Sequence, residues 1–259
     1  MNLKIVEPRV VLLAHTNPVG GGSAERVVAA ASKLCYSKSD AGTLLDGLDD
    51  EKTSEFLRKL SDYGHVSPVE HISFTFGIEG ISRACSHQIV RHRLASYSQQ
   101  SQRYVDLSSE EVGFIIPPEI KEDEKMLNKY ILDVKNEFEE YANFTDDLCK
   151  KYIFDGMSDK AALKKALEDA RFLLPNACET KLVMTMNARS LLNFFSERCC
   201  NRAQWEIRNV AEQMLDLVYP LAPNIFENAG ASCLKGPCPE GKMTCGKPKM
   251  KKRGLYGKR

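Results

Sequence analysis

The sequence predicts a single domain of the α+β class, with more helix than strand, several long helices and a small mixed or antiparallel sheet. A strict alternation of apolar and polar residues over 72–78 indicates a half-buried strand. Apolar residues at helical spacing recur over 123–154, which indicates a long amphipathic helix. The 259 residues show no internal repeat and no change of composition before residue 230, so one domain is the simplest organisation.

The first half of the chain is expected to mix strands and helices. In order, these are a short N-terminal strand, a buried strand over 10–15, helices over 24–34 and 44–60, and the strand over 72–78. The helix over 44–60 is expected to stop at Gly64, because glycine is common just after a helix. After Gly80 the apolar spacing changes, and Ile81, Cys85 and Ile89 would share one face of a helix.

The second half is predicted to be mostly helical. After the long helix over 123–154, we expect a helix over 161–173, a strand over 180–186, and helices over 188–199 and 203–218. Pro175 and Pro220 follow two of these helices. Proline lacks a backbone N–H and cannot continue a helix, so both positions support the predicted ends.

Composition and charge exclude several classes of protein. A hydrophobic fraction of 43% and a net charge of +1 exclude disorder of the whole chain. No apolar run approaches the ~18 residues that a membrane-spanning helix needs. The N-terminus lacks the basic, apolar and small-residue segments of a signal peptide. We therefore expect a soluble, cytoplasmic protein that does not contact membranes.

The C-terminal segment differs in composition from the rest of the chain. Residues 235–259 carry nine Lys or Arg and one Glu, a net charge of +8, which leaves −7 for the first 234 residues. We therefore divide the chain into a domain over 1–232 and a basic, cysteine-containing tail over 233–259 that is expected to be flexible. A basic tail would suit a nucleic acid, but a solvated appendage is favoured because an acidic body is not typical of nucleic-acid binding.

The nine cysteines are expected to be reduced thiols, since the chain shows no export signal. Cys233, Cys238 and Cys245 follow the spacing C-x4-C-x6-C, and Cys199 and Cys200 lie upstream. Structural zinc sites are commonly built from C-x2-C pairs, and no such pair occurs among these cysteines. On spacing alone, no metal site is expected.

Residues 81–105 contain no Asp or Glu, but they hold several Ser and Gln residues and the arginines Arg83, Arg91, Arg93 and Arg103. Such uncompensated arginines suit a phosphate or a nucleotide, because a guanidinium group matches phosphate oxygens bidentately. A solvated basic surface would have the same composition. In a continuous helix, Arg83, His87 and Arg91 would share one face.

The order of residues in this window is more specific than its composition. Arg91-His92-Arg93, seven residues, and then Ser101-Gln102-Arg103 give the pattern R-H-R-x7-S-x-R. Further blocks lie in order at 64–71 (GHVSPVEH), 187–194 (NARSLLNF) and 203–207 (AQWEI). Together they resemble the flavin-dependent thymidylate synthases, over residues 64–207. The resemblance implies that family's own α+β fold, in a homotetramer whose active sites form where subunits meet.

The resemblance also implies a reaction. Deoxyuridylate (dUMP) is reductively methylated to thymidylate (dTMP), with 5,10-methylenetetrahydrofolate as carbon donor and hydride transfer through FAD from NADPH. No side chain is expected to bond covalently to the uracil. Cys85 reads as a core residue, and the hydroxyl of Ser101 is a poor nucleophile without an adjacent base.

Site residues follow from the resemblance position by position. Those that match FAD contacts are Ser67, Arg91, His92, Arg93, Gln99, Asn187, Ala188, Arg189 and Asn193. Those that match dUMP contacts are Gln88, Ile89, Val90, Arg91, Gln99, Gln100, Ser101, Gln102, Arg103, Arg171 and Arg198. Arg198 matches the catalytic arginine that activates the uracil ring, and His65 matches a histidine near the folate and flavin rings.

Gln99 and Ser98 stand where the family often has Glu and Asn, and Gln99 can donate hydrogen bonds but carries no charge. Arg189 and Asn193, at i and i+4 of a helix, can meet one ligand together. Arg198 lies nine residues beyond Arg189, about half a turn round an ideal helix, so it is expected to face another direction.

Two other classes of function would also explain the arginines. A nucleic-acid-binding module would use the basic tail, but it leaves the blocks at 64–71 and 187–194 without a role. A phosphotransferase acting on nucleotides would need a phosphate-binding loop. No G-x-x-x-x-G-K-[ST] pattern occurs, and Gly20-Gly21-Gly22 is followed by Ser23-Ala24 rather than Lys.

Overall fold

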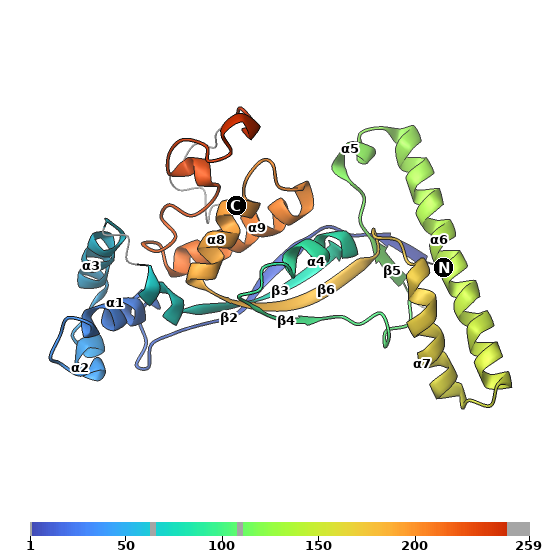
Figure 1. Ribbon diagram of the computed structural model, residues 1–259, viewed down its shortest axis with the longest axis horizontal. Helices are drawn as coiled ribbons and strands as arrows, with labels where there is room; N and C mark the ends of the chain where they lie inside the picture. The colour runs from blue at the N-terminus through green and yellow to red at the C-terminus, as the bar shows by residue number, and fades with distance from the viewer. Residues whose placement is uncertain (1, 63–65, 108–110, 248–259) are drawn as a thin grey trace. The chain divides into compact units, whose positions relative to one another are not determined.

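The computed structural model describes residues 2–62, 66–107 and 111–247. Their contacts divide the chain into two compact units. The first unit comprises Met1–Pro8, Glu79–Ile89 and Ser98–Leu182, and the second comprises Arg9–Ile78, Val90–Tyr97 and Val183–Arg259. Helices and strands occur in both units (Figure 1), which confirms the α+β class.

The described residues form two sheets. The larger has the strand order β2-β3-β6-β4, from β2 (Arg9–His15), β3 (Ser73–Ser82), β6 (Glu179–Asn187) and β4 (Ser96–Gln99). Strands β3, β4 and β6 each begin in one unit and end in the other, so neither unit is a continuous stretch of the sequence. In the smaller sheet, β1 (Asn2–Ile5) pairs in parallel with β5 (Glu111–Phe114).

The first unit is built around a pair of helices that lie side by side (Figure 1). These are α6 (Glu124–Phe154) and α7 (Asp159–Ala170). They contact α5 (Pro118–Lys121) and the 3-10 turn η2 (Arg171–Leu173), and α4 (Arg83–Ile89) belongs to the same unit. Asp123 caps α6, since its side chain accepts hydrogen bonds from two backbone N–H groups of the first turn. Phe138 of α6 is fully buried and packs in one cluster with Phe114 and Cys178.

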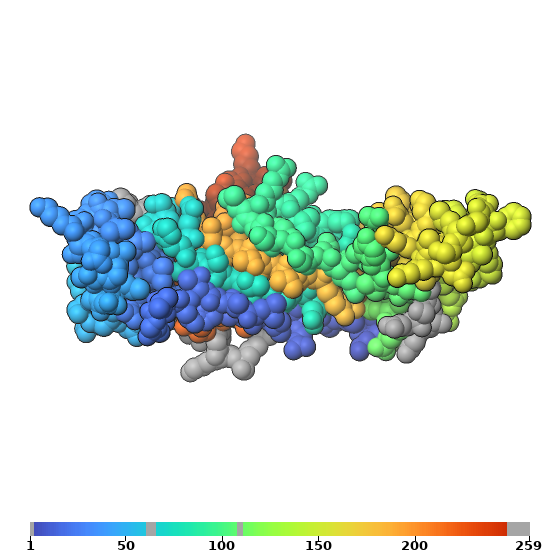
Figure 2. Space-filling view, turned by 90° about the horizontal axis from the view of Figure 1, so that it is seen from below, coloured from blue at the N-terminus to red at the C-terminus, as the bar shows by residue number. Residues whose placement is uncertain are grey.

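The second unit contains most of the short helices. They are α1 (Glu25–Leu34), α2 (Ala41–Asp46), α3 (Asp50–Asp62), α8 (Ala188–Arg198) and α9 (Trp205–Val218), with the 3-10 turns η1 (Ser67–His71), η3 (Tyr219–Leu221), η4 (Ser232–Leu234) and η5 (Gly241–Met243). Helices α1 to α3 form one cluster, in blue at the left of Figure 2. Buried Phe194 and Phe195 of α8 lie edge-to-face, and Phe195 lies edge-to-face with Phe226.

The structure corrects three sequence expectations. The helix expected over 44–60 is two helices, because Asp49 caps a new helix by accepting a hydrogen bond from the Lys52 N–H. Strand β3 continues past Gly80, which has a positive φ of 63° and donates its N–H to the Glu179 carboxylate at 3.2 Å, and α4 begins only at Arg83. Helix α4 ends at Ile89, so Arg91 does not share a helical face with Arg83. The expected stop at Gly64 lies outside the described residues.

No helix among the residues that the structure describes is long and apolar enough to cross a membrane.

Candidate active site

The block at 187–194 forms the junction between β6 and α8. Asn187 ends the strand and caps the helix, because its side-chain oxygen accepts a hydrogen bond of 2.8 Å from the Ser190 N–H. The Ala188 N–H donates to the Ile72 carbonyl at 2.9 Å, and the Ala188 side chain is fully buried. These bonds fix the start of α8, whose first turn carries Arg189 and whose second turn carries Asn193.

A cavity of about 690 Å³ lies beside this junction, wholly within the second unit. We call it the arginine cavity; its lining residues are Glu70, Arg91, His92, Arg93, Leu94, Met186, Asn187, Arg189, Ser190, Asn193, Glu197 and Arg198. Six of the residues matched to FAD contacts and the arginine matched to uracil activation therefore meet around one space. A volume of this size is typical of cavities that bind small molecules or cofactors.

His92 and Arg198 are in direct contact in this cavity. The Arg198 Nε donates a hydrogen bond of 3.0 Å to the His92 Nε2. The His92 ring also lies edge-to-face on the Phe194 ring, with centroids 4.7 Å apart. Burial, and secondarily the charge of Arg198, lowers the pKa of His92 below its ordinary value. The neutral imidazole is therefore favoured, as the acceptor role of Nε2 requires.

Arg198 lines the same cavity as Arg189, so the expectation that the two face different directions is wrong. Arg198 is the last residue of α8. A long helical side chain leans over the preceding turn of its helix, and the Arg198 side chain bonds to His92, whose ring packs on Phe194 one turn earlier. The spacing of residues around a helix gives only the direction of the Cα–Cβ bonds and not the reach of a long side chain.

The charges of the arginine cavity suit an anionic cofactor. Four guanidinium groups line it, against the two carboxylates of Glu70 and Glu197. Arg189 forms an ion pair with Glu70, whereas Arg91 and Arg93 form none within the described residues. FAD carries a diphosphate, and unpaired guanidinium groups bind such oxygens well. The residues present therefore fit FAD in both volume and charge.

A second group of predicted residues lies in the first unit. Arg103 forms an ion pair with Glu168 at 2.9 Å, and its backbone N–H donates to the Ser101 hydroxyl at 3.2 Å. The Arg103 Nε is buried without a hydrogen-bond partner among the described residues. A buried donor left unsatisfied is costly and points to a missing acceptor. Arg103 is thus poised for an anionic ligand.

Arg83 is a candidate that the resemblance did not assign. Burial, and to a lesser degree the charge of Arg171, lowers the pKa of Arg83, so the two guanidinium groups lie close enough to repel. An anion bound near both guanidinium groups would offset this repulsion. The absence of acidic residues over 81–105 was the sequence signal that singled out Arg83.

The glutamines of the motif are tied into the first unit. The Gln99 Nε2 donates to the Thr180 hydroxyl at 3.1 Å, and the Gln100 N–H donates to the Lys181 carbonyl at 2.9 Å. Gln102 makes a longer contact of 3.9 Å with the Cys178 sulfur. The neutral Gln99 side chain therefore has a neutral hydrogen-bond partner. A Glu at this position would find only the Thr180 hydroxyl as a donor.

The remaining predicted residues are placed as follows. Ser67 begins η1 and is exposed, and it is not among the described residues that line the arginine cavity. Gln88 is half-buried in α4, Ile89 is fully buried, and Val90 is 38% exposed. The whole of Ile89 is closed to solvent, so neither its side chain nor its backbone is open to a ligand in this conformation. His65 lies outside the described residues.

Comparison with known proteins identifies the class that this fold and site define. A family model described as thymidylate synthase complementing protein matches residues 12–224. The chain therefore belongs to that family, as the sequence motifs predicted. Its relatives include a flavin-dependent thymidylate synthase of Clostridium tetani, 52% identical over 97% of this chain and 99% of that protein. One of Geobacter sulfurreducens is 47% identical over 95% of this chain and 97% of that protein.

A solved structure supports the same fold. The UMP/dUMP methylase PolB of Streptomyces cacaoi, bound with 5-Br dUMP, superposes with a TM-score of 0.62 and covers 88% of this chain and 96% of that one. Its sequence identity is 22%, so this likeness concerns the fold alone.

Proposed function

We propose that this chain is a flavin-dependent thymidylate synthase that reductively methylates dUMP to dTMP. 5,10-Methylenetetrahydrofolate donates the carbon and NADPH is the reductant. The observation that carries the proposal is the arginine cavity, where the predicted FAD residues and Arg198 line one space of about 690 Å³. The relatives named flavin-dependent thymidylate synthase, matched over nearly the whole chain, support the same activity.

The arginine cavity is the proposed FAD site. Arg91, Arg93 and Arg189 would hold the cofactor by charge-assisted hydrogen bonds, with Asn187 and Asn193 supplying neutral contacts. When bound, FAD supplies hydride transfer, chemistry that no side chain provides. His92 holds Arg198 at one wall of the cavity through the 3.0 Å bond.

Arg198 is the proposed catalytic residue. Its guanidinium group keeps a positive charge at all working pH values. The Arg198 guanidinium group would stabilise the negative charge that develops on the uracil ring, in a site closed to water. The residues of this chain thus bind, orient and stabilise charge, and no covalent bond to the uracil is needed.

The proposed dUMP site comprises Arg103, Arg171, Ser101 and Gln102. The unpartnered Nε of Arg103 supports a phosphate there. The ion pair between Arg103 and Glu168 would be exchanged for one with the substrate phosphate, which offers more acceptor oxygens. Arg83, which repels Arg171, adds to the attraction for a dianion.

We also propose a homotetramer in which neighbouring subunits complete each site. Large apolar side chains stand exposed next to three site arginines: Leu94 is 80%, Tyr104 64% and Phe172 84% exposed. Exposed apolar groups of this kind mark interaction surfaces. Light scattering of the purified protein should give four chains per particle.

A cytoplasmic location is proposed as well. It is supported by the nine cysteines, none of which forms a disulfide.

An anaerobic assay tests the proposed function. The purified yellow protein is mixed with dUMP, methylenetetrahydrofolate and NADPH, and dTMP is quantified by chromatography. We expect dTMP only when all three compounds are present. Formation of dTMP without NADPH over many turnovers, or no dTMP from protein with full flavin content, would show that the proposal is wrong.

A further inference from the structure

The R-H-R block lies on a connection that has no regular secondary structure. Residues 90–95 join α4 to β4 and belong to neither a helix nor a strand. Four of these six residues are exposed, so few buried side chains hold the connection in place. The connection nevertheless carries His92, whose ring accepts the hydrogen bond from Arg198. The position of that ring therefore depends on contacts outside the helix and strand ladders.

Tyr97 supplies such a contact to the backbone of His92. Its hydroxyl donates a hydrogen bond of 2.7 Å to the His92 carbonyl. Burial raises the pKa of Tyr97 to about 12, so the hydroxyl keeps its proton and remains a donor at neutral pH. Tyr97 itself lies in β4, which pairs with β6 in the larger sheet. The bond therefore ties the irregular connection to the edge of this sheet.

The ring of His92 is held by a second contact. It lies edge-to-face on Phe194, with centroids 4.7 Å apart and an interplanar angle of 76°. Phe194 is fully buried, so it offers a fixed surface to the ring. Tyr97 thus holds the carbonyl of His92 and Phe194 holds its ring. Both ends of the residue are placed for Nε2 to accept the Arg198 bond of 3.0 Å.

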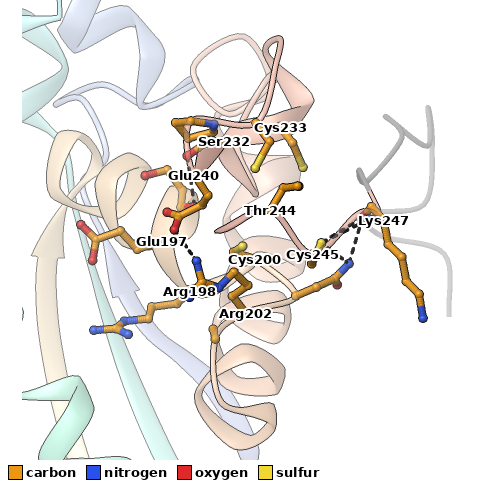
Figure 3. A pocket seen from close by; sticks show the side chains of 15 residues that line it. Glu197, Arg198, Cys200, Arg202, Ser232, Cys233, Glu240, Thr244, Cys245 and Lys247 are labelled. Atoms are coloured by element: carbon orange, nitrogen blue, oxygen red, sulfur yellow. Dashed lines mark hydrogen bonds and ion pairs between the residues drawn. The ribbon is translucent and has the colours of Figure 1, made fainter. Parts of the chain in front are cut away.

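The direction of the Arg198 side chain depends on this acceptor. Arg198 forms no ion pair within the described residues, and its side chain has one hydrogen bond there, the bond to His92. Figure 3 shows the side chain extending from the end of α8 away from Cys200 and Cys245, which border a cavity of about 240 Å³. A single acceptor, the His92 Nε2, therefore orients the guanidinium group.

We propose that Tyr97 is a positioning residue of this site: its hydroxyl fixes His92, and His92 orients the guanidinium group of Arg198. The inference rests on the proposed function, in which Arg198 acts on the uracil ring. All three residues belong to the second unit. Tyr97 is not among the described residues that line the arginine cavity, so its effect is on orientation and not on direct contact with a ligand.

Tyr97→Phe tests the proposal, because it removes the hydroxyl and keeps the ring. In full-length protein saturated with FAD, kcat for dTMP formation should fall about 2- to 12-fold, the factor that corresponds to one neutral hydrogen bond. KM for dUMP should be unchanged, since Arg103 and Arg171 lie in the first unit. Tyr130→Phe is the matched control. Its hydroxyl also donates to a backbone carbonyl, that of Ile115 at 3.0 Å, but in the first unit, and kcat should be unchanged.

A double variant separates positioning from general support of the fold. His92→Ala removes the imidazole but keeps the carbonyl that Tyr97 contacts. If Tyr97 acts through the ring, adding Tyr97→Phe to His92→Ala should cause no further loss of kcat. Equal losses of kcat from Tyr97→Phe in the wild-type and His92→Ala backgrounds would overturn the proposal. A loss in Tyr130→Phe as large as that in Tyr97→Phe would overturn it as well.

A measurement that needs no activity keeps the test decisive if His92→Ala misfolds. In flavin-loaded protein labelled with ¹⁵N-histidine, the His92 signals, assigned by their absence from His92→Gln, should show a neutral ring with its proton on Nδ1. In Tyr97→Phe a fraction protonated on Nε2 should appear, because the ring is then free to leave Arg198. An unchanged tautomer would overturn the proposal. The expected tautomer change in a protein that forms no dTMP would overturn the proposed function alone and support the positioning of Arg198.

Discussion

The Nε of Arg198 donates a hydrogen bond of 3.0 Å to the Nε2 of His92. Because Nε2 accepts this bond, the proton of the neutral imidazole must lie on Nδ1. Protonation of His92 would replace the hydrogen bond by repulsion between two cations. The orientation of the proposed catalytic arginine therefore depends on a histidine that stays neutral.

The first prediction concerns pH. The pKa of His92 is lowered in the folded protein, so the unfolded chain binds its proton more readily. The free energy of unfolding contributed by His92 should be fully present above the unfolded pKa of about 6.5 and should fall as the pH drops below it. In His92→Gln this part of the acid dependence should disappear. Urea unfolding of both proteins across this range measures it, and an unchanged pH profile in the variant would contradict the account.

Arg198→Ala should lower kcat by about 10²- to 10³-fold, because it removes a charge that acts on the uracil ring during the reaction. Bound FAD, measured by absorbance after gel filtration, should remain. Ser101→Ala should retain measurable turnover, since no nucleophilic role is assigned to that hydroxyl. A uracil adduct trapped on Ser101 or on a cysteine, detected by mass spectrometry, would refute the mechanism.

Arg103→Ala and Arg171→Ala should weaken dUMP binding. A charge-assisted hydrogen bond contributes about 1.5–3 kcal/mol, so KM for dUMP should rise about 10- to 150-fold. Glu168→Gln is the matched control, because it removes only the partly exposed ion partner of Arg103, and KM should change by no more than a few-fold. If flavin is lost from Arg171→Ala while dUMP affinity is kept, the assignment of Arg171 is wrong.

Arg189→Ala should loosen FAD. The same contribution predicts a rise in the FAD dissociation constant of about 10- to 150-fold, measured by quenching of flavin fluorescence. Arg189→Lys should fall between the variant and the wild type, because a single ammonium cannot make the bidentate contact. Arg58→Ala, at an exposed position of α3, should bind FAD normally. Equal affinity in Arg189→Ala and Arg58→Ala would place the cofactor elsewhere.

Periodicity in the sequence predicted the long elements well. The helix α6 and the strand β6 lie within one residue of the predicted ranges 123–154 and 180–186. The strand β4 was missed, since Ser96–Gln99 has no apolar alternation and is defined only by its pairing with β6. The break between α2 and α3 was missed because a cap at Asp49 overrides the apolar pattern.

The candidate site, like the fold, was predicted only in part. Of the nine residues that the ordered motifs matched to FAD, six line the arginine cavity, whereas Ser67, Gln99 and Ala188 do not. The motifs did not predict that Arg198 and Arg189 line this cavity together, because that depends on how far each side chain extends from its helix. Nor did spacing predict that Cys200 and Cys233 line one cavity, because Cys200 lies 33 residues before Cys233 in the sequence and the two are brought together only by the fold.

The most direct test of the central claim is a single turnover. Protein whose bound flavin has been reduced and freed of excess reductant is mixed anaerobically with dUMP and methylenetetrahydrofolate, and dTMP is counted against flavin. The account predicts up to one dTMP per bound flavin, and none from protein stripped of flavin. Equal dTMP from the stripped protein, or no dTMP from the reduced protein, would contradict it.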